Sequence, residues 1–349
     1  MTDTQVVLCG YYGAGNGGDE ALLASMLEIL PPNVKPLVLS ANPQETTARY
    51  GVATVNRKSL GVLKALRSSQ ALILGGGSLI QDATSVQSAV YYGGLVGLAK
   101  QLGLQVIALG QGIGPLNQQI TKWVAEKAFG SCDALSVRDK ASAFILQDWS
   151  ISCMMAPDPV WNLAALALPE LADLPTPRIA ITLREHPDLT PDRLQVITQA
   201  LVELQKATNS WVMIMPFQPS DLSIAHQVQA QIPEHSQIIA LSDPRQLKGA
   251  FQGVHLAIGM RYHSLIMAAA EGCRCFALSY DPKIDQLMED LVMPGWQVSA
   301  IPPDKEQVFK AWLQQFQQGE PLAKKHLMEL QTKTRIHKEL LAAALNNKS

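Results

Sequence analysis

The sequence has little surplus charge and no cysteine pattern that points to a metal or a disulfide framework. Its 28 lysines and arginines nearly balance 30 aspartates and glutamates, so it has no electrostatic footprint for nucleic acid. The five cysteines are scattered and odd in number, and the one close pair, Cys273 and Cys275, lacks the second pair that a zinc site needs. We expect five reduced core thiols in a cytoplasmic protein without a bound metal.

Long apolar runs are also missing. The most apolar long window, residues 89–109, contains Lys100, Gln101 and Gln105 and is too interrupted to cross a membrane. The first ten residues hold an acid and no basic segment, so we expect no signal peptide. Because 47% of the 349 residues are hydrophobic and 17% charged, we expect a globular protein of two domains, cytoplasmic or peripheral at a membrane.

Several catalytic and nucleotide-binding motifs are absent as well. The chain has no G-x-x-x-x-G-K-[ST], no H-E-x-x-H and no Ser-His-Asp order. The segment "GAGNGG" at residues 13–18 matches G-x-G-x-x-G, but the second predicted strand ends in "VLSAN", with Ser40 and Asn42 where a ribose needs an acid. We therefore exclude NAD and FAD and expect no cofactor.

Short apolar runs alternate with helical patterns along the whole chain. The runs show no apolar–polar alternation, which is typical of strands buried on both faces of a parallel sheet. In the first half they are "VVLC", "PLVLS", "ALILGGG", "QVIALGQG" and "ALSVRD", with helices beginning near Asp19, Ser59, Leu79 and Ile120. In the second half they are "RIAITLRE", "WVMIMPF", "IIALS", "VHLAIGMRYH" and "CFALSYD".

A stretch with three prolines and no strand pattern, residues 162–178, separates the two halves. We predict an α/β protein with a Rossmann-like domain at residues 1–165, a second one at 176–303 and two C-terminal helices at 304–349. The last helix is expected at about residues 322–345, with one basic side. Two such domains facing each other would bring the carboxyl ends of their strands to a shared cleft.

Three glycine-rich loops, at residues 13–18, 75–77 and 110–115, follow predicted strands of the first half. One glycine would suffice for a tight turn, whereas consecutive glycines allow a ligand to approach the backbone. We therefore expect substrate contacts here, and the residues that we assign to them are Gly13, Asn16, Gly18, Gly76 and Gly77.

Asp19 follows the first glycine loop, where a helix begins. It is either the N-cap of that helix or a general base or ligand for an acceptor hydroxyl, and the two roles are compatible. A helix N-terminus favours its ionised form.

Cationic residues follow several other predicted strands. Arg138 either forms a surface pair with Asp139 or points into the cleft, and Arg184 ends the first strand of the second half. Arg261 and His263 fall in a turn before a helix expected from about Ser264, and an arginine, an imidazole and a helix N-terminus together indicate an anion site.

Lys283 follows the next predicted strand, in "SYDPKI". Pro282 suits the first turn of a helix, and Asp281 would cap that helix. The lysine is either solvated or at the edge of the same anion site.

Taken together, these segments resemble the polysaccharide pyruvyl transferase family, in its CsaB branch. Ala14 is the one departure, because the family has an aromatic residue there. The segments, in the family's order from Val6 to about Ile284, are "GYYGAGNGGDEALL", "LILGGGSLIQD", "GQGIGP", "SVRD", "PDPV", "GMRYHSLIMAAAEG" and "SYDPKI".

The resemblance implies a fold like the GT-B glycosyltransferases, with phosphoenolpyruvate as donor and a sugar as acceptor. The acceptor belongs to a cell-wall or extracellular polysaccharide or its precursor, free or lipid-linked. The product is a pyruvate ketal that bridges two sugar hydroxyls, with release of phosphate.

By this resemblance, Asp19 matches the acidic catalytic position, and Arg138, His263 and Lys283 match donor-binding positions. We expect His263 to protonate the enol carbon and Asp19 to take the proton of the sugar hydroxyl. The first glycine loop would hold the sugar, with Tyr11 or Tyr12 stacking on it. Two alternatives stay open: an inverting GT-B glycosyltransferase that uses a nucleotide sugar, and a non-catalytic sugar-phosphate-binding protein.

Overall fold

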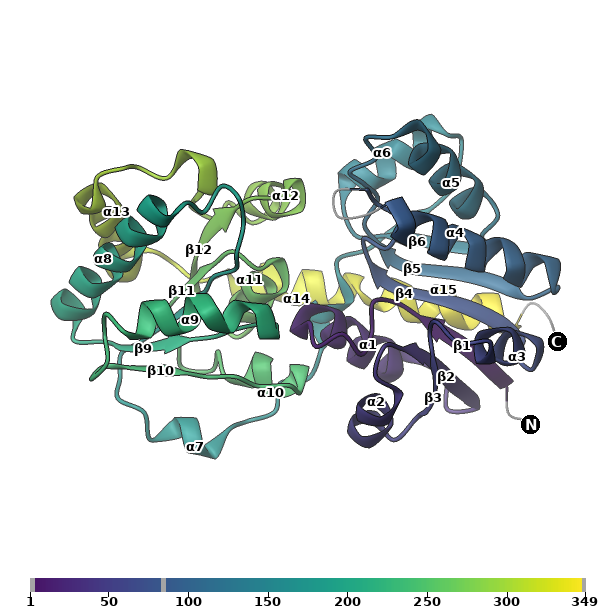
Figure 1. Cartoon of the computed structure of the whole chain (residues 1–349), viewed down its shortest axis with the longest axis horizontal. Helices are drawn as coiled ribbons and strands as arrows, with labels where there is room; N and C mark the ends of the chain where they lie inside the picture. The colour runs from purple at the N-terminus through teal and green to yellow at the C-terminus, as the bar shows by residue number, and fades with distance from the viewer. Residues whose placement is uncertain (1–3, 83–85, 347–349) are drawn as a thin grey trace. The chain divides into compact units, whose positions relative to one another are not determined.

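The computed structural model describes residues 4–82 and 86–346 and divides the chain into two compact units (Figure 1). Unit 1 comprises the chain up to Ala14, Asp19–Leu163 and the chain from Glu329 onward. Unit 2 comprises Gly15–Gly18 and Ala164–Met328. The four residues of the first glycine loop that precede Asp19 therefore pack with the second half of the chain.

Unit 1 is built on a seven-stranded parallel sheet of order β3-β2-β1-β4-β5-β6-β7. All seven residues of β4 are buried, as expected for a strand covered on both faces. The strands are β1 (Thr4–Cys9), β2 (Val34–Ser40), β3 (Ala53–Asn56), β4 (Ala71–Gly77), β5 (Gln105–Gln111), β6 (Ala134–Val137) and β7 (Met154–Met155). The edge strands β3 and β7 were not predicted from the sequence, because they are short and lack a continuous buried run.

Helices connect the strands of unit 1 in sequence. They are α1 (Gly17–Ile29, whose first two residues lie in unit 2), α2 (Pro43–Tyr50), α3 (Gly61–Arg67), α4 (Val86–Gln101), α5 (Gln119–Gly130) and α6 (Lys140–Asp148). The predicted helix start near Leu79 is wrong. Leu79 and Ile80 are non-helical, and both are buried in the core.

Unit 2 is built on a six-stranded parallel sheet of order β10-β9-β8-β11-β12-β13. Its strands are β8 (Arg178–Thr182), β9 (Trp211–Ile214), β10 (Ser236–Ile238), β11 (Leu256–Gly259), β12 (Arg274–Ser279) and β13 (Gly295–Gln297). Its helices are α7 (Pro169–Ala172), α8 (Pro191–Thr208), α9 (Leu222–Gln229), α10 (Pro244–Gly249), α11 (Tyr262–Ala270), α12 (Pro282–Leu291) and α13 (Lys305–Gln318).

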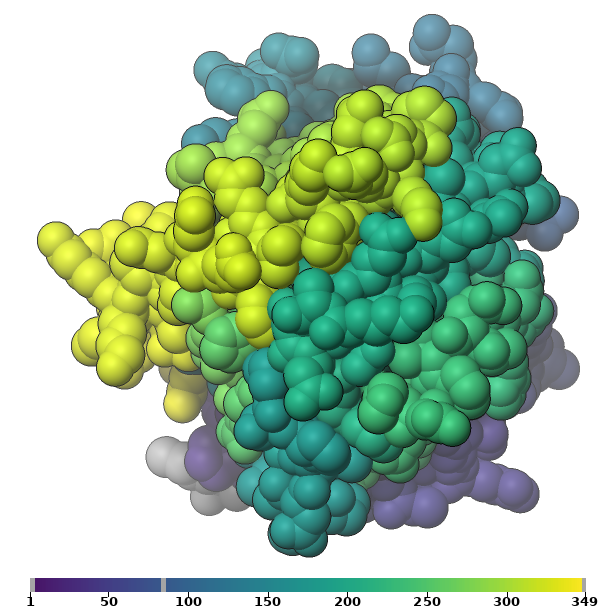
Figure 2. All heavy atoms as spheres, turned by 90° about the vertical axis from the view of Figure 1, so that its left-hand side faces the viewer, coloured from purple at the N-terminus to yellow at the C-terminus, as the bar shows by residue number. Residues whose placement is uncertain are grey.

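The C-terminal helices do not form a body of their own. Figure 2 shows α13, in yellow-green, lying along α8, in teal, and Trp312 of α13 is completely buried in the core of unit 2. The predicted last helix is two helices, α14 (Lys324–Lys333) and α15 (Arg335–Asn346), broken at Thr334. The α15 helix packs against β5 and β6 of unit 1.

The five cysteines are free thiols, although only Cys9, Cys273 and Cys275 are fully buried. Burial raises the pKa of the Cys9 thiol to about 12, which suits an inert core residue. Within residues 4–82 and 86–346, no helix combines the length and the apolar character needed to cross a membrane. The same residues contain no group of three or more His, Cys, Asp or Glu side chains that could hold a metal.

Candidate functional site

The first glycine loop is held by Glu20. The backbone N–H of Gly13 donates to Oε1 of Glu20 over 2.8 Å. Gly13 has a φ of +72°, and a Cβ on it would lie 2.0 Å from Oγ of Ser40. The positive φ and the packing against Ser40 therefore require a glycine at this position, independently of any contact with a substrate.

Burial raises the pKa of the Glu20 carboxyl above its ordinary value, whereas hydrogen bonds from Gly13 and Tyr50 and the charge of Arg49 lower it. The side chain is almost fully buried, and Oη of Tyr50 donates to Oε2 over 3.1 Å. Glu20 is not among the residues predicted from the sequence. The sequence feature that could have indicated it is its position beside Asp19, in the first turn of the predicted helix.

Asp19 is not the N-cap of α1, so that prediction is wrong. The helix begins at Gly17, which makes Asp19 the third helical residue, and Oδ1 of Asn16 accepts the N–H of Gly18 over 3.0 Å instead. Asp19 is half-buried in the first turn, where the helix dipole favours a negative charge.

The second glycine loop ends β4 and packs on Tyr12. The hydroxyl of Tyr12 donates to the carbonyl of Gly75 over 2.6 Å, and a Cβ on Gly75 would lie 2.2 Å from that hydroxyl. Gly76 and Gly77 have φ values of +83° and +87°, which other residues rarely adopt. The prediction that Tyr12 stacks on a sugar is wrong because its side chain is 1% exposed.

Tyr11 remains available for such stacking. Its side chain is 42% exposed, and the guanidinium of Arg57 lies 4.6 Å from the ring centroid.

Arg138 directly follows β6 and is buried rather than at the surface. Its Nη1 lies 3.0 Å from Oδ2 of Asp158, and its Nη2 donates to Oγ of Ser78 over 3.2 Å. The surface pair with Asp139 is therefore the wrong interpretation, since Oδ2 of Asp139 is 3.9 Å from Nε and its carboxylate caps α6 by accepting the N–H of Ser142. Asp158 belongs to the "PDPV" segment, whose role could not be predicted from the sequence.

The predicted cationic residues of unit 2 follow three strands that are neighbours in its sheet. Arg184 comes two residues after β8, Arg261 two residues after β11, and Lys283 four residues after β12. Because the strands are parallel, these positions share the carboxyl end of the sheet.

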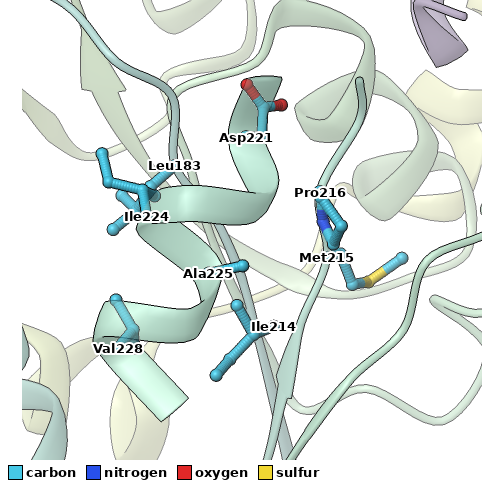
Figure 3. Close-up of a pocket in the computed structure, with 8 residues that line it drawn as sticks. All are labelled: Leu183, Ile214, Met215, Pro216, Asp221, Ile224, Ala225 and Val228. Carbon is cyan, nitrogen blue, oxygen red and sulfur yellow. The ribbon is translucent and has the colours of Figure 1, made fainter. Parts of the chain in front are cut away.

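Arg261 is the N-cap of α11 and forms a buried pair with Asp221. Its Nε donates to Oδ2 of Asp221 over 3.1 Å, and its Nη2 donates to Oδ1. Figure 3 shows the Asp221 carboxylate directed away from Ile214 and Val228 of the small apolar pocket that it borders. Two donors of Arg261 thus bind a carboxylate within the protein, and no sequence pattern predicts this partner, which lies 40 residues away.

Two other cations have partners near β12. Nη1 of Arg184 donates to the hydroxyl of Tyr280 over 2.8 Å, and its guanidinium lies 4.8 Å from that ring's centroid. Asp281 caps α12 as predicted, accepting the N–H of Lys283, and its Oδ2 lies 2.9 Å from Nζ of Lys283. The Lys283 side chain is 30% exposed, so it is partly open to solvent.

His263 is the second residue of α11 rather than part of the preceding turn, because the helix begins at Tyr262. Its ring lies against Gly18: a Cβ on Gly18 would be 2.3 Å from Nδ1 of His263. The structure therefore places Asn16, Gly18, Arg184, Arg261, His263 and Lys283 in unit 2, and Gly13, Asp19, Gly76, Gly77 and Arg138 in unit 1.

The model of one protein family, the polysaccharide pyruvyl transferases, matches residues 16–282 of the chain. The chain belongs to this family. The match includes the glycine loop from Asn16, the Arg138 and His263 segments, and the start of α12. No curated protein sequence matches this member of the pyruvyl transferase family.

Solved structures with the same fold include epimerases and a glycosyltransferase. The S. aureus MnaA–UDP structure has a TM-score of 0.67 at 10% identity, covering 97% of this chain and 94% of that one. UDP-GlcNAc 2-epimerase from Neisseria meningitidis, bound to UDP-GlcNAc, gives 0.66 at 10% identity, with 98% and 100% covered. A glycosyltransferase from Rickettsia africae gives 0.56 at 13% identity, with 100% and 97% covered. This pyruvyl transferase family member thus has the predicted two-domain, GT-B-like α/β fold.

Proposed function

We propose that this protein transfers the pyruvyl group of phosphoenolpyruvate to a sugar of a cell-wall or extracellular polysaccharide, or of its precursor. The product is a pyruvate ketal, and inorganic phosphate is released. We also propose the CsaB branch, on the seven segments in their family order. The acceptor is free or lipid-linked, and the protein works in the cytoplasm or at the membrane surface.

One observation carries this proposal. In a chain of the pyruvyl transferase family, Arg184, His263 and Lys283 follow three adjacent strands at the carboxyl end of one sheet. Phosphoenolpyruvate presents a carboxylate and a phosphate, and guanidinium, ammonium and helix N-termini bind such groups.

The reaction requires two proton transfers at the start. His263 donates a proton to the methylene carbon of the enol while the first sugar oxygen forms a bond to C2. Asp19 accepts the proton of that hydroxyl, and its place in the first turn of α1 supports a carboxylate for this role.

The ketal closes in a second step. The second sugar hydroxyl forms a bond to C2, the bond from C2 to the phosphate oxygen breaks, and phosphate leaves with the electron pair. The proton of the second hydroxyl passes to the phosphate or to solvent. Since the gain of hydrogen at C3 balances the gain of oxygen at C2, the reaction involves no net oxidation or reduction, and we propose no cofactor.

The cationic residues proposed for the donor site differ in their burial and in their partners within the protein. Lys283 and Arg184 are partly exposed, and we propose that they contact the donor directly. Arg261 and Arg138 are buried and form ion pairs with carboxylates of the protein. We therefore propose that they act mainly by positioning the loops that contain them. On the acceptor side, we propose that Gly76, Gly77 and Tyr11 contact the sugar.

A product analysis tests the proposal. The purified protein is incubated with phosphoenolpyruvate and a panel of synthetic and lipid-linked sugars, and phosphate and pyruvylated product are measured together. We expect them to appear in equal amounts. A parallel series with UDP-sugars tests the glycosyltransferase alternative, which the UDP-bound structures of the same fold make worth testing. Release of UDP alone would overturn the proposal, and donor binding without turnover across the panel would favour the non-catalytic alternative.

A further inference from the structure

Gly18 and His263 lie in contact within unit 2, although they are far apart in the sequence. A Cβ built on Gly18 lies 2.3 Å from Nδ1 and 3.0 Å from Cγ of the imidazole. Atoms that are not bonded do not approach so closely, because attraction between carbon atoms is optimal near 3.5–4.0 Å. Any side chain at position 18 must therefore displace the ring.

The loop on the Gly18 side is pinned in place. The N–H of Gly17 donates to the carbonyl of Phe217 over 2.7 Å, and the N–H of Gly18 donates to Oδ1 of Asn16 over 3.0 Å. A Cβ on Gly17 would lie 2.4 Å from Cδ1 of Leu247, so this backbone also packs closely on unit 2. The loop has little room to retreat from an added methyl group.

The start of α11, which carries His263, is also connected to Phe217. Arg261 caps α11, and its guanidinium binds the buried carboxylate of Asp221. That carboxylate also accepts the N–H of Phe217 over 3.1 Å. Phe217 thus joins Gly17 on one side to Asp221 and Arg261 on the other, so the loop and the start of α11 are held as one assembly.

We propose that Gly18 is a positioning residue for His263: its missing side chain makes the space that fixes the imidazole. The inference deepens the function proposed above and rests on it for the catalytic role of His263. A methyl group at position 18 rotates or tilts the imidazole while the assembly around Phe217 stays in place. A displacement of a reacting group by about 1 Å can cost about 100-fold in rate.

Two measurements on the full-length protein test this inference. The first is the melting temperature of four proteins: wild type, Gly18→Ala, His263→Ala and the double variant. We expect Gly18→Ala to lower Tm in the wild type and to lower it far less when His263 is alanine, because the clash is then absent. Gly94→Ala, on an exposed face of α4 with no atom within 4 Å of the added methyl, is the matched control and should not lower Tm.

The second measurement is steady-state kinetics with phosphoenolpyruvate. We expect Gly18→Ala to lower kcat by about 100-fold, with a much smaller change in the KM of the acceptor. A general weakening of the fold would not produce this split, and Gly94→Ala should leave both constants unchanged.

The outcomes separate this inference from the proposed function. An equal loss of Tm with and without the His263 imidazole, or an unchanged kcat in Gly18→Ala, would overturn the positioning role. If Gly18→Ala alone does not fold, a folded double variant supports the inference and an unfolded one overturns it. If the wild type shows no turnover of phosphoenolpyruvate, the proposed function fails, and the four melting temperatures still decide whether Gly18 seats His263.

Discussion

Arg138 and Asp158 form a buried ion pair at the carboxyl end of β6, with Nη1 of the arginine 3.0 Å from Oδ2 of the aspartate and neither side chain more than 2% exposed. Asp158 also accepts the N–H of Val160 over 3.0 Å, so it fixes the turn that follows β7. Removing one partner of a buried pair leaves the other charge without compensation.

We predict that Asp158→Asn destabilises unit 1 by about 3–5 kcal/mol, the usual cost of breaking a buried pair from one side. Urea unfolding followed by tryptophan fluorescence measures this change. Glu306→Gln is the control, because its pair with Lys310 is exposed and should contribute little. A loss no larger than that of the control would show that Arg138 finds another partner.

We expect Lys283 to contribute to the use of phosphoenolpyruvate and not to the stability of the fold. Its pair with Asp281 is partly exposed, and such pairs contribute about 0–1 kcal/mol. A lost charge-assisted bond to phosphate costs about 1.5–3 kcal/mol, so we predict that Lys283→Ala lowers kcat/KM for phosphoenolpyruvate by about 10- to 100-fold. Steady-state kinetics and a thermal melt, with Lys310→Ala as control, check both parts. Unchanged kinetics would remove Lys283 from the donor site.

Asp19 is predicted to act on the acceptor hydroxyl as a base. Asp19→Asn keeps the shape and removes the basic oxygen, so kcat should fall by about 100- to 10,000-fold while the KM of the acceptor changes little. Glu28→Gln, at the other end of α1, is the control and should leave kcat unchanged. A rise in acceptor KM with kcat intact would mean that Asp19 binds the sugar without taking its proton.

We predict that His337 of α15 makes the stability of unit 1 depend on pH. Its Nδ1 lies 2.9 Å from Oγ of Ser136 and its Nε2 lies 2.8 Å from the carbonyl of Pro157. Burial lowers the pKa of His337 below its ordinary value of 6.5, although the bond to Pro157 and the charge of Asp158 oppose this.

The unfolded chain therefore binds a proton at His337 near pH 6.5, before the folded chain does. The resulting stability is present above pH 6.5 and is lost as pH falls through the lowered pKa of the folded protein. We predict that the wild-type Tm falls on acidification from pH 7 to pH 5 and that His337→Gln falls less, whereas His235→Gln, at an exposed position, follows the wild type. Parallel Tm curves for His337→Gln and wild type would contradict this prediction.

The parallel α/β fold could be predicted from local sequence because continuous apolar runs report strands buried on both faces. The same runs located the strand ends that carry Arg184, Arg261 and Lys283 in unit 2. Short edge strands such as β3 and β7 escaped prediction because half-exposed strands of two to four residues carry no such pattern.

Individual motifs were less informative about what each side chain touches. Some glycines that were interpreted as allowing a ligand to approach the backbone are required by packing within the protein. Gly75 makes room for Tyr12, and Gly13 lies against Ser40. Arg261, read as an anion ligand, holds Asp221, which is 40 residues away in the sequence.

The sequence by itself determined the fold class, the family and the strand ends at which polar residues gather, because apolar periodicity and motif order are properties of neighbouring residues. Only the tertiary structure decided which charges are paired, that the glycine loop is divided between two units, and that Gly18 lies against His263. Those relationships depend on packing between segments that are distant in the chain, and the composition of either segment alone does not encode the partner that it meets.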